Sequence, residues 1–185
     1  MKIFEKPGPD NTNEACRIAI ERAMQKQASI VASTTTGNAG VQLCAIAKEM
    51  DYQGKIVIVT HAFGSKEPGK NVLEDENRET LLKNGAQLVT AAHALSGVER
   101  GISSKFQGVY PAEIIANSLR MVCSGLKVSV EISCMALDAG AIDYGTEVIC
   151  MGGTGRGLDT AVVMTPSHAS RIFETKIHEI LCMPY

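Results

Sequence analysis

Three apolar runs alternate with helix-like segments in the first half of the chain, and this alternation limits the folds open to it. The runs cover 28–32, 55–60 and 86–91, and the first is apolar enough for a fully buried strand. Strands separated by helices form βαβ units, which have right-handed crossovers and parallel strands. The sequence therefore predicts an α/β fold around a mostly parallel sheet.

Apolar residues that recur every three or four positions mark the helices between these runs. Asn11 is expected to cap a helix that ends near Gln27, with Glu14 completing a capping box. Two further helices are expected over 38–50 and 74–84, the second of them charged and closed by a glycine.

The second half of the chain begins with a long glycine-containing segment, 92–110. We expect it to be irregular, and long irregular segments often carry function. Helices are expected over 111–124 and 126–139. The tail, 175–183, fits a strand or a short helix equally well.

Two more strands are expected over 146–151 and 160–164. The glycine-rich segment between them is too short for a crossover helix, so the two strands are predicted to form an antiparallel hairpin.

Composition excludes several classes of function. A chain of 185 residues with 45% hydrophobic content is expected to form one domain, 1–185, around one core. The net charge is −2 and no basic cluster is present, so we expect neither nucleic acid nor a membrane as partner. No apolar stretch approaches the ~20 residues of a membrane span, and the first residues lack the apolar core of a secretory signal.

The cysteines and histidines point to a cytoplasmic protein without a metal site. The six cysteines are dispersed within apolar patterns and never form C-x-x-C, which favours reduced, buried thiols. The histidines lack the spacing of metal ligands, so no metal is expected.

The turn after the first strand has the composition of an anion site. The first turn of a helix leaves backbone N–H groups unpaired, the helix dipole favours negative charge there, and consecutive hydroxyls add donors. The pattern is neither a P-loop nor a dinucleotide fingerprint, so a phosphate monoester on a small molecule is the predicted ligand. The candidate binding residues are Ser33, Thr34, Thr35, Thr36, Gly37, Asn38, Ala39 and Gly40.

A second candidate loop is the hairpin tip, 152–159. It is either a flexible loop or a backbone nest with a cationic clamp for the same anion. Asp159 is expected to bond to the backbone of its own loop. The candidate binding residues are Gly153, Thr154, Gly155, Arg156 and Gly157.

Four more residues are candidate ligand contacts, each with a simpler alternative. His61 follows a strand and is either a ligand contact or proton carrier, or an ordinary loop histidine. Glu99 and Arg100 lie in the glycine-containing segment and contact ligand or form a surface ion pair. Tyr110 either packs or touches a ring system of the ligand.

The helix over 126–139 is almost wholly apolar but contains Lys127 and Glu131. We expect Glu131 to face solvent and to pair with Lys127 one turn away, the alternative being a buried carboxylate with a raised pKa. This apolar helix and the alanine-rich first helix offer surface to a second copy, so a homo-oligomer is expected.

The order of these features resembles the C-terminal domain of pyruvate kinase. It is more similar still to the stand-alone archaeal and bacterial proteins classed as pyruvate kinase C-terminal domain-like, over essentially the whole chain. The segments that carry the resemblance are V-T-H at 59–61, S-G-V-E-R-G-I-S at 96–103, V-Y-P-A-E-I-I at 109–115, V-E-I-S-C-M-A-L-D-A-G at 130–140 and G-G-T-G-R-G-L-D-T-A at 152–161.

The resemblance implies a three-layer α/β/α fold with strand order 3-2-1-4-5, strand 5 antiparallel, and flavin mononucleotide (FMN) bound in relatives. Strand 1 would neighbour strand 4, and the crevice between their carboxyl ends is the switch point where open sheets bind ligands. In pyruvate kinases the equivalent turn resembles the pocket for the effector's phosphate, and the hairpin tip closes over it.

The same resemblance implies that the chain is not a pyruvate kinase, because no barrel and none of the barrel's catalytic groups are present. The expected function is binding of FMN or another small phosphorylated ligand between the two loops. The alternatives are a non-catalytic sensor of a phosphorylated metabolite, or an enzyme that uses His61 with Glu99 or Glu131 as acid and base.

Overall fold

A computed structural model describes all 185 residues and places seven strands in one sheet of order β1-β7-β6-β5-β2-β3-β4. The strands are β1 (Lys2–Phe4), β2 (Ser29–Thr34), β3 (Ile56–Thr60), β4 (Gln87–Thr90), β5 (Val148–Gly152), β6 (Thr160–Thr165) and β7 (Lys176–Pro184). The run β4-β3-β2-β5-β6 is the predicted order 3-2-1-4-5, with β6 antiparallel to β5. The predicted fold class is confirmed.

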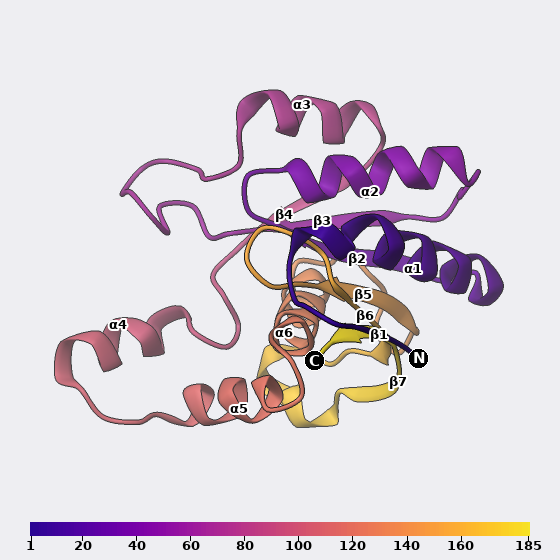
Figure 1. Ribbon diagram of the computed structural model, residues 1–185. Helices are drawn as coiled ribbons and strands as arrows, with labels where there is room; N and C mark the ends of the chain where they lie inside the picture. Colours follow the sequence, from indigo (N-terminus) through magenta and orange to yellow (C-terminus); the bar gives the residue numbers. More distant parts are fainter.

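Helices cover both faces of this sheet (Figure 1). One face carries α1 and α2, with α3 against α2, and the other carries α6, with α5 against α6. None of the helices is both long and apolar enough to cross a bilayer. Their bounds are α1 (Thr12–Lys26), α2 (Asn38–Glu49), α3 (Asp75–Lys83), α4 (Gly97–Phe106), α5 (Pro111–Arg120) and α6 (Ser124–Asp138), with 3-10 turns η1 (Pro9–Asn11) and η2 (Ala169–Glu174).

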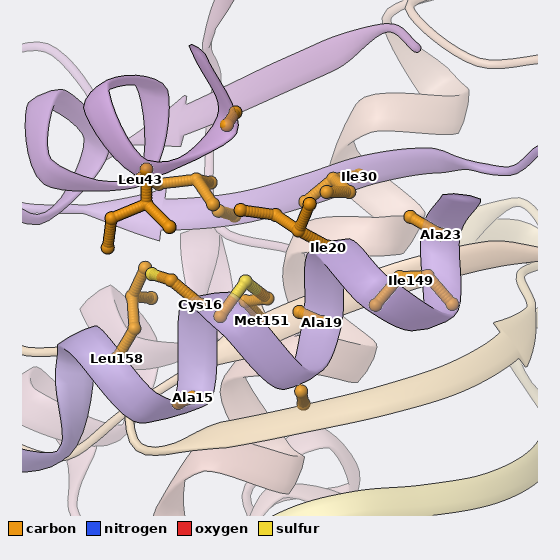
Figure 2. Packing of buried hydrophobic residues seen from close by; sticks show 14 of the residues in the cluster. Ala15, Cys16, Ala19, Ile20, Ala23, Ile30, Leu43, Ile149, Met151 and Leu158 are labelled. Atoms are coloured by element: carbon orange, nitrogen blue, oxygen red, sulfur yellow. The ribbon is translucent and has the colours of Figure 1, made fainter. Parts of the chain in front are cut away.

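The central strands divide their side chains between two cores. In β2, Ile30 and Ala32 face α1 and α2, whereas Val31 faces α6, as the two-residue period of a strand requires. Small residues on α1 let that helix lie close to the sheet, and Figure 2 shows its side chains meeting Ile149 and Met151. Strands buried on both faces explain why the sequence reads as continuous apolar runs.

The surfaces from which we expected self-association are used within the chain itself. Ala15, Ala19 and Ala23 of α1 are fully buried against the sheet. The apolar residues of α6 lie between the sheet, α5 and η2. Most of the apolar surface of the two helices is therefore covered within the chain, while Met24 of α1 stays 46% exposed.

The two ends of the chain and one helix go beyond the sequence prediction. The tail, which fitted a strand or a short helix, is a strand, β7, which pairs antiparallel with β6 and parallel with the unpredicted edge strand β1. A helix, α4, occupies part of the segment that we predicted to be irregular. The glycines at 97 and 101 indicated a loop. In addition, α4 has no buried residue, so its sequence shows no apolar stripe that would mark a helix packed on a core.

The predicted capping box at the start of α1 does not form. Asn11 precedes the helix, but its amide donates to the Lys6 carbonyl at 2.7 Å instead of accepting from the first turn. Glu14 pairs with Lys2 at 2.9 Å. Contacts with the residues that precede α1 therefore replace the capping box.

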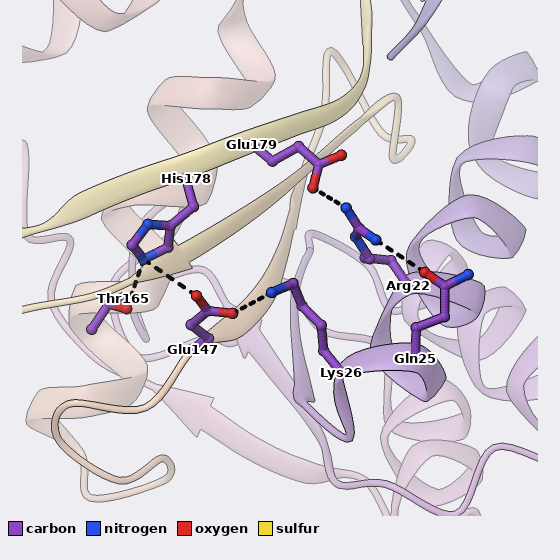
Figure 3. Close-up of polar contacts among 7 residues, drawn as sticks. All are labelled: Arg22, Gln25, Lys26, Glu147, Thr165, His178 and Glu179. Carbon is purple, nitrogen blue, oxygen red and sulfur yellow. Dashed lines mark hydrogen bonds and ion pairs between the residues drawn. The ribbon is translucent and has the colours of Figure 1, made fainter.

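Ion pairs join α1 to the end of the sheet where β5 begins (Figure 3). Lys26 Nζ lies 2.6 Å from Glu147, which precedes β5, and Arg22 pairs with Glu179 of β7. These side chains are partly exposed, so each pair contributes only about 0–1 kcal/mol. Their effect is to hold α1 across β5 and β7.

All six cysteines are buried and free, which predicts inert thiols and a loss of stability at alkaline pH. Burial raises the pKa of Cys44 to about 11 and of Cys16 and Cys182 to about 12. Unfolded thiols ionise near pH ~8.5, so above that pH the unfolded chain loses protons that the native chain keeps. The free energy of unfolding should therefore fall as the pH rises from about 8.5 to about 12.

Urea titrations at a series of alkaline pH values measure this fall, and a thiol reagent at about pH 8 should react only as the chain unfolds. Rapid reaction of the native thiols would contradict the assignment.

Candidate functional site

A cavity of about 780 Å³ lies at the carboxyl ends of β2 and β3, on the face of the sheet that α6 covers. Its walls come from the ends of these strands, the segment after β4, the first turn of α4, α6 and the tip of the β5–β6 hairpin. Here β2 and β5 are parallel neighbours, and the chain leaves them in opposite directions. The cavity therefore occupies the predicted switch point.

The structure brings about half of the candidate residues into the cavity lining. Those in the lining are Ser33, Thr34, Thr35, His61, Arg100, Gly153, Gly155, Arg156 and Gly157. Those outside it are Thr36, Gly37, Asn38, Ala39, Gly40, Glu99, Tyr110 and Thr154.

The second half of the strand-to-helix turn is fixed by α3. The Thr36 carbonyl accepts from Asn77 Nδ2 and from Glu74 N, both at 3.1 Å. Gly37 has φ 110°, and a Cβ there would lie 2.3 Å from Asn77 Cβ. These contacts explain the residue types in this half of the turn without a ligand.

The first half of the turn lines the cavity, and one of its residues has a buried hydroxyl that makes no hydrogen bond. Thr34 is 6% exposed, and its Oγ1 has no hydrogen-bond partner. A buried hydroxyl without a partner costs about 1–3 kcal/mol. No side chain caps the N-terminus of α2, which begins a few residues later. The protein leaves donors unused at this wall of the cavity.

The glycine-rich hairpin tip is anchored rather than free. Asp159 accepts from Thr154 N at 3.2 Å, as predicted, and also from Gly8 N at 3.0 Å. A Cβ on Gly157 would lie 2.3 Å from Pro9 Cα, so only glycine allows this approach. The N-terminal segment thus sets the position in which the tip, with Arg156, lines the cavity.

Glu99 and Tyr110 serve local structure. Glu99 accepts from the backbone N–H groups of Ala112 at 3.2 Å and Glu113 at 3.1 Å, the first turn of α5. A carboxylate at a helix N-terminus is stabilising. Tyr110 donates its hydroxyl to the Gln107 carbonyl at 3.1 Å. Arg100 lines the cavity instead of pairing with Glu99.

The expectation that Glu131 faces solvent is wrong. Glu131 does accept from Lys127, but their side chains are only 6% and 8% exposed, and both line the cavity. Glu131 also accepts from Leu95 N at 2.9 Å. Burial lowers the pKa of Lys127, the Glu131 charge and hydrogen bond oppose this, and Arg120 and Arg100 lower it further. The i, i+4 spacing suits a surface helix, but α6 is buried almost all round.

His93 and Arg120 are lining residues that sequence reasoning missed as ligand contacts. His93 follows β4 much as His61 follows β3, so the same strand-end rule could have found it. The two imidazole centroids lie 5.0 Å apart, and His93 Nε2 accepts from Ala62 N at 3.4 Å. Burial lowers the pKa of both histidines, and the charge of His93 lowers the pKa of His61 further. Arg120 ends a helix and carried no signal in the sequence.

The cavity favours anions. Arg100, Arg120, Lys127 and Arg156 line it, opposed by one carboxylate, Glu131. Cations gathered around a concave surface attract negatively charged ligands. No group of three or more His, Cys, Asp or Glu side chains is placed to hold a metal ion.

The sequence model of the family described as "Pyruvate kinase, alpha/beta domain" matches residues 13–164. The chain belongs to this family. Every residue of the cavity lining lies within the match, whereas β1 and β7 lie outside it.

Pyruvate kinase structures from Cryptosporidium parvum are also similar, at 15% identity. The match to one of them covers 89% of this chain and 24% of the enzyme, with a TM-score of 0.43. The match to another covers 95% of this chain and 23% of the enzyme, with a TM-score of 0.35. A third, in complex with ADP, covers 95% and 24%, with a TM-score of 0.38. The chain spans about a quarter of the length of these enzymes.

In this pyruvate kinase α/β domain, His61 and His93 should titrate below their ordinary pKa of about 6.5. As the pH falls below that value, the unfolded chain takes up protons that the native site resists, so stability falls. His93→Gln removes one cause of the shift and should raise the pKa of His61. Titration of the imidazole C–H resonances by NMR measures both values. An unchanged His61 midpoint in the variant would show that the two rings are not coupled.

Removing one member of the buried ion pair should cost far more than removing both. Glu131→Ala leaves the Lys127 ammonium buried without a partner and should lower the free energy of unfolding by about 3–5 kcal/mol. A Lys127→Met/Glu131→Met double variant leaves no buried charge without a partner, so it should regain most of this lost stability. The remaining loss should be about 1–3 kcal/mol, the cost of the Leu95 N–H that no longer has an acceptor. Urea unfolding at about pH 7 compares them, and an equal loss in both would contradict a buried charge pair.

Proposed function

We propose that this domain binds a small molecule that carries a phosphate monoester, with FMN as the ligand of first choice. The observation that carries the proposal is a cationic cavity lined by the end of β2, where the Thr34 hydroxyl is buried without a partner. A phosphate oxygen would give this hydroxyl an acceptor once the Thr34 side chain turns Oγ1 toward the cavity. Thr35 and Ser33 line the same wall and would add donors.

The charge of the lining supports a dianion more than a neutral ligand. Arg156 lines the cavity from the glycine-rich hairpin tip, which follows β5, the strand beside the one that bears Thr34. Guanidinium groups bind phosphate through paired N–H donors. The anchored tip would hold Arg156 over a phosphate on the Thr34 side.

The remaining space suits a bulky group attached to the phosphate. A volume of about 780 Å³ lies within the range of small-molecule sites. Val59, Val128, Ile132 and Met135 supply an aliphatic surface for a planar ring. FMN, which the resemblance to flavin-binding relatives suggests, combines a phosphate with such a ring. The flavin would supply its own redox chemistry.

A second candidate function is non-catalytic sensing of a phosphorylated metabolite, which would bind its phosphate at the same wall of the cavity. In the third hypothesis, acid–base catalysis, Glu99 is no longer a candidate acid or base, because its carboxylate caps α5. The pair of His61 with Glu131 still lies in the lining, although Glu131 is engaged by Lys127.

Thermal shift assays with FMN, riboflavin and glucose phosphate test the proposal, because a ligand of the native state raises its stability. FMN should raise the Tm more than riboflavin, which lacks the phosphate. Thr34→Val should weaken FMN binding about tenfold or more, the value of a hydrogen bond to a charged group, and should leave the unliganded protein as stable or more stable.

Ser129→Ala is the matched control. Ser129 also has a fully buried hydroxyl without a partner, but it does not line the cavity. This variant should share the stability effect and keep FMN binding. Equal shifts from FMN and riboflavin would overturn the phosphate site, and shifts from sugar phosphates alone would favour the sensor.

A further inference from the structure

Building on the phosphate site of the proposed function, we propose that Lys127 is a reactive amine that captures phosphorylated aldehydes or ketones as imines in this cavity. Glu131 is the proton partner of the amine. The ligand would place its phosphate at the Thr34 wall and its carbonyl carbon at Lys127 Nζ.

The placement of Lys127 is unusual for a lysine of this chain. Its side chain is 8% exposed, whereas the other lysines in ion pairs, such as Lys26 and Lys70, are 33% and 68% exposed. Burying an ammonium group costs several kcal/mol unless a partner compensates. Lys127 nevertheless lies in the wall of a cavity instead of reaching solvent. A lysine serving only solubility or a surface ion pair would not need this position.

Glu131 is held so that one oxygen serves the amine. Its Oε1 accepts from Leu95 N at 2.9 Å, and its Oε2 accepts from Lys127 Nζ. The carboxylate is thus fixed by the backbone of the segment before α4. Its second oxygen lies where a proton from Nζ can be taken and later returned.

The surroundings lower the pKa of Lys127, so its ammonium gives up a proton to form the nucleophilic amine more readily than that of a surface lysine. Burial is the main cause that lowers the pKa of Lys127, and the nearby charges of Arg120 and Arg100 act in the same direction. Desolvation beside other cations is a known way to activate a lysine amine toward carbonyl compounds.

The step balances without a further reactant. Nζ gives a proton to Glu131, and its lone pair attacks the carbonyl carbon while the π electrons move to oxygen. Proton transfer through Glu131 from nitrogen to oxygen gives the carbinolamine. Nitrogen then expels the hydroxyl group, which leaves as water with a proton from Glu131. The products are a protonated imine, water and the Glu131 carboxylate.

The test uses the full chain and pyridoxal phosphate, an aldehyde with a phosphate monoester, followed by borohydride reduction and peptide mass spectrometry. Reduction fixes the imine as a stable secondary amine on the lysine that formed it. Lys127 should be labelled about tenfold faster than exposed lysines such as Lys48. Pyridoxal without phosphate should label it about tenfold more slowly, and FMN should protect it.

Three variants separate chemistry from folding. Lys127→Arg keeps the charge and the pairing with Glu131 but cannot form an imine, so it should stay folded and lose the label. The double variant Lys127→Met/Glu131→Met removes both charges and should also lose it. Lys48→Arg is the surface control and should keep the label on Lys127.

The outcomes also distinguish this inference from the phosphate site itself. Retained FMN binding with Lys127 unlabelled, or labelled no faster than Lys48, overturns the imine while the phosphate site stands. Fast labelling of Lys127 that neither FMN nor removal of the phosphate slows supports the reactive amine and overturns the phosphate site. Fast labelling with both effects supports the two together.

Discussion

The parallel pairing of β2 with β5 is the constraint on which the cavity depends. Residues 29–32 pair with 148–151, and from this central pair the chain winds outward toward β3 on one side and β6 on the other. No connection crosses the crevice between the two strand ends, so the loop after β2 and the hairpin tip after β5 both line it. The pairing persists because α1 and α2 bury one face of these strands and α6 buries the other.

A contact between two glycines then places α6 beside the crevice. A Cβ on Gly152, at the end of β5, would lie 2.2 Å from the Gly125 carbonyl oxygen, and one on Gly125 would lie 2.0 Å from Thr160 Oγ1. Backbone thus meets backbone where α6 begins. The first two turns of α6 are therefore set against the strand ends, which puts Lys127 and Glu131 in the cavity wall. The two glycines, Gly125 and Gly152, thus determine where Lys127 and Glu131 lie.

This chain of contacts explains what the sequence could and could not predict. The five central strands and the two cavity loops followed from local patterns, namely apolar runs, helical periodicity and the short hairpin connection. The order of the strands followed from the resemblance to the pyruvate kinase C-terminal domain. Burial of Glu131, the anchoring of Asp159 and the edge strand β1 depend on partners distant in the sequence, such as Leu95 and Gly8. Helix α4 was missed because it buries nothing, so no apolar stripe toward a core marked it.

The two proposed features of the cavity act on each other through charge. A phosphate dianion near Thr34 and Arg156 would favour the protonated form of any nearby amine, since opposite charges stabilise each other at low dielectric. That effect would slow attack by Lys127, but it would also stabilise the positively charged imine that forms. Arg100 and Arg120 oppose the ammonium and would be partly neutralised by the same phosphate. The site would therefore hold the imine more firmly for a phosphorylated carbonyl than for an uncharged one, because the phosphate compensates a positive charge that is present throughout the bound state.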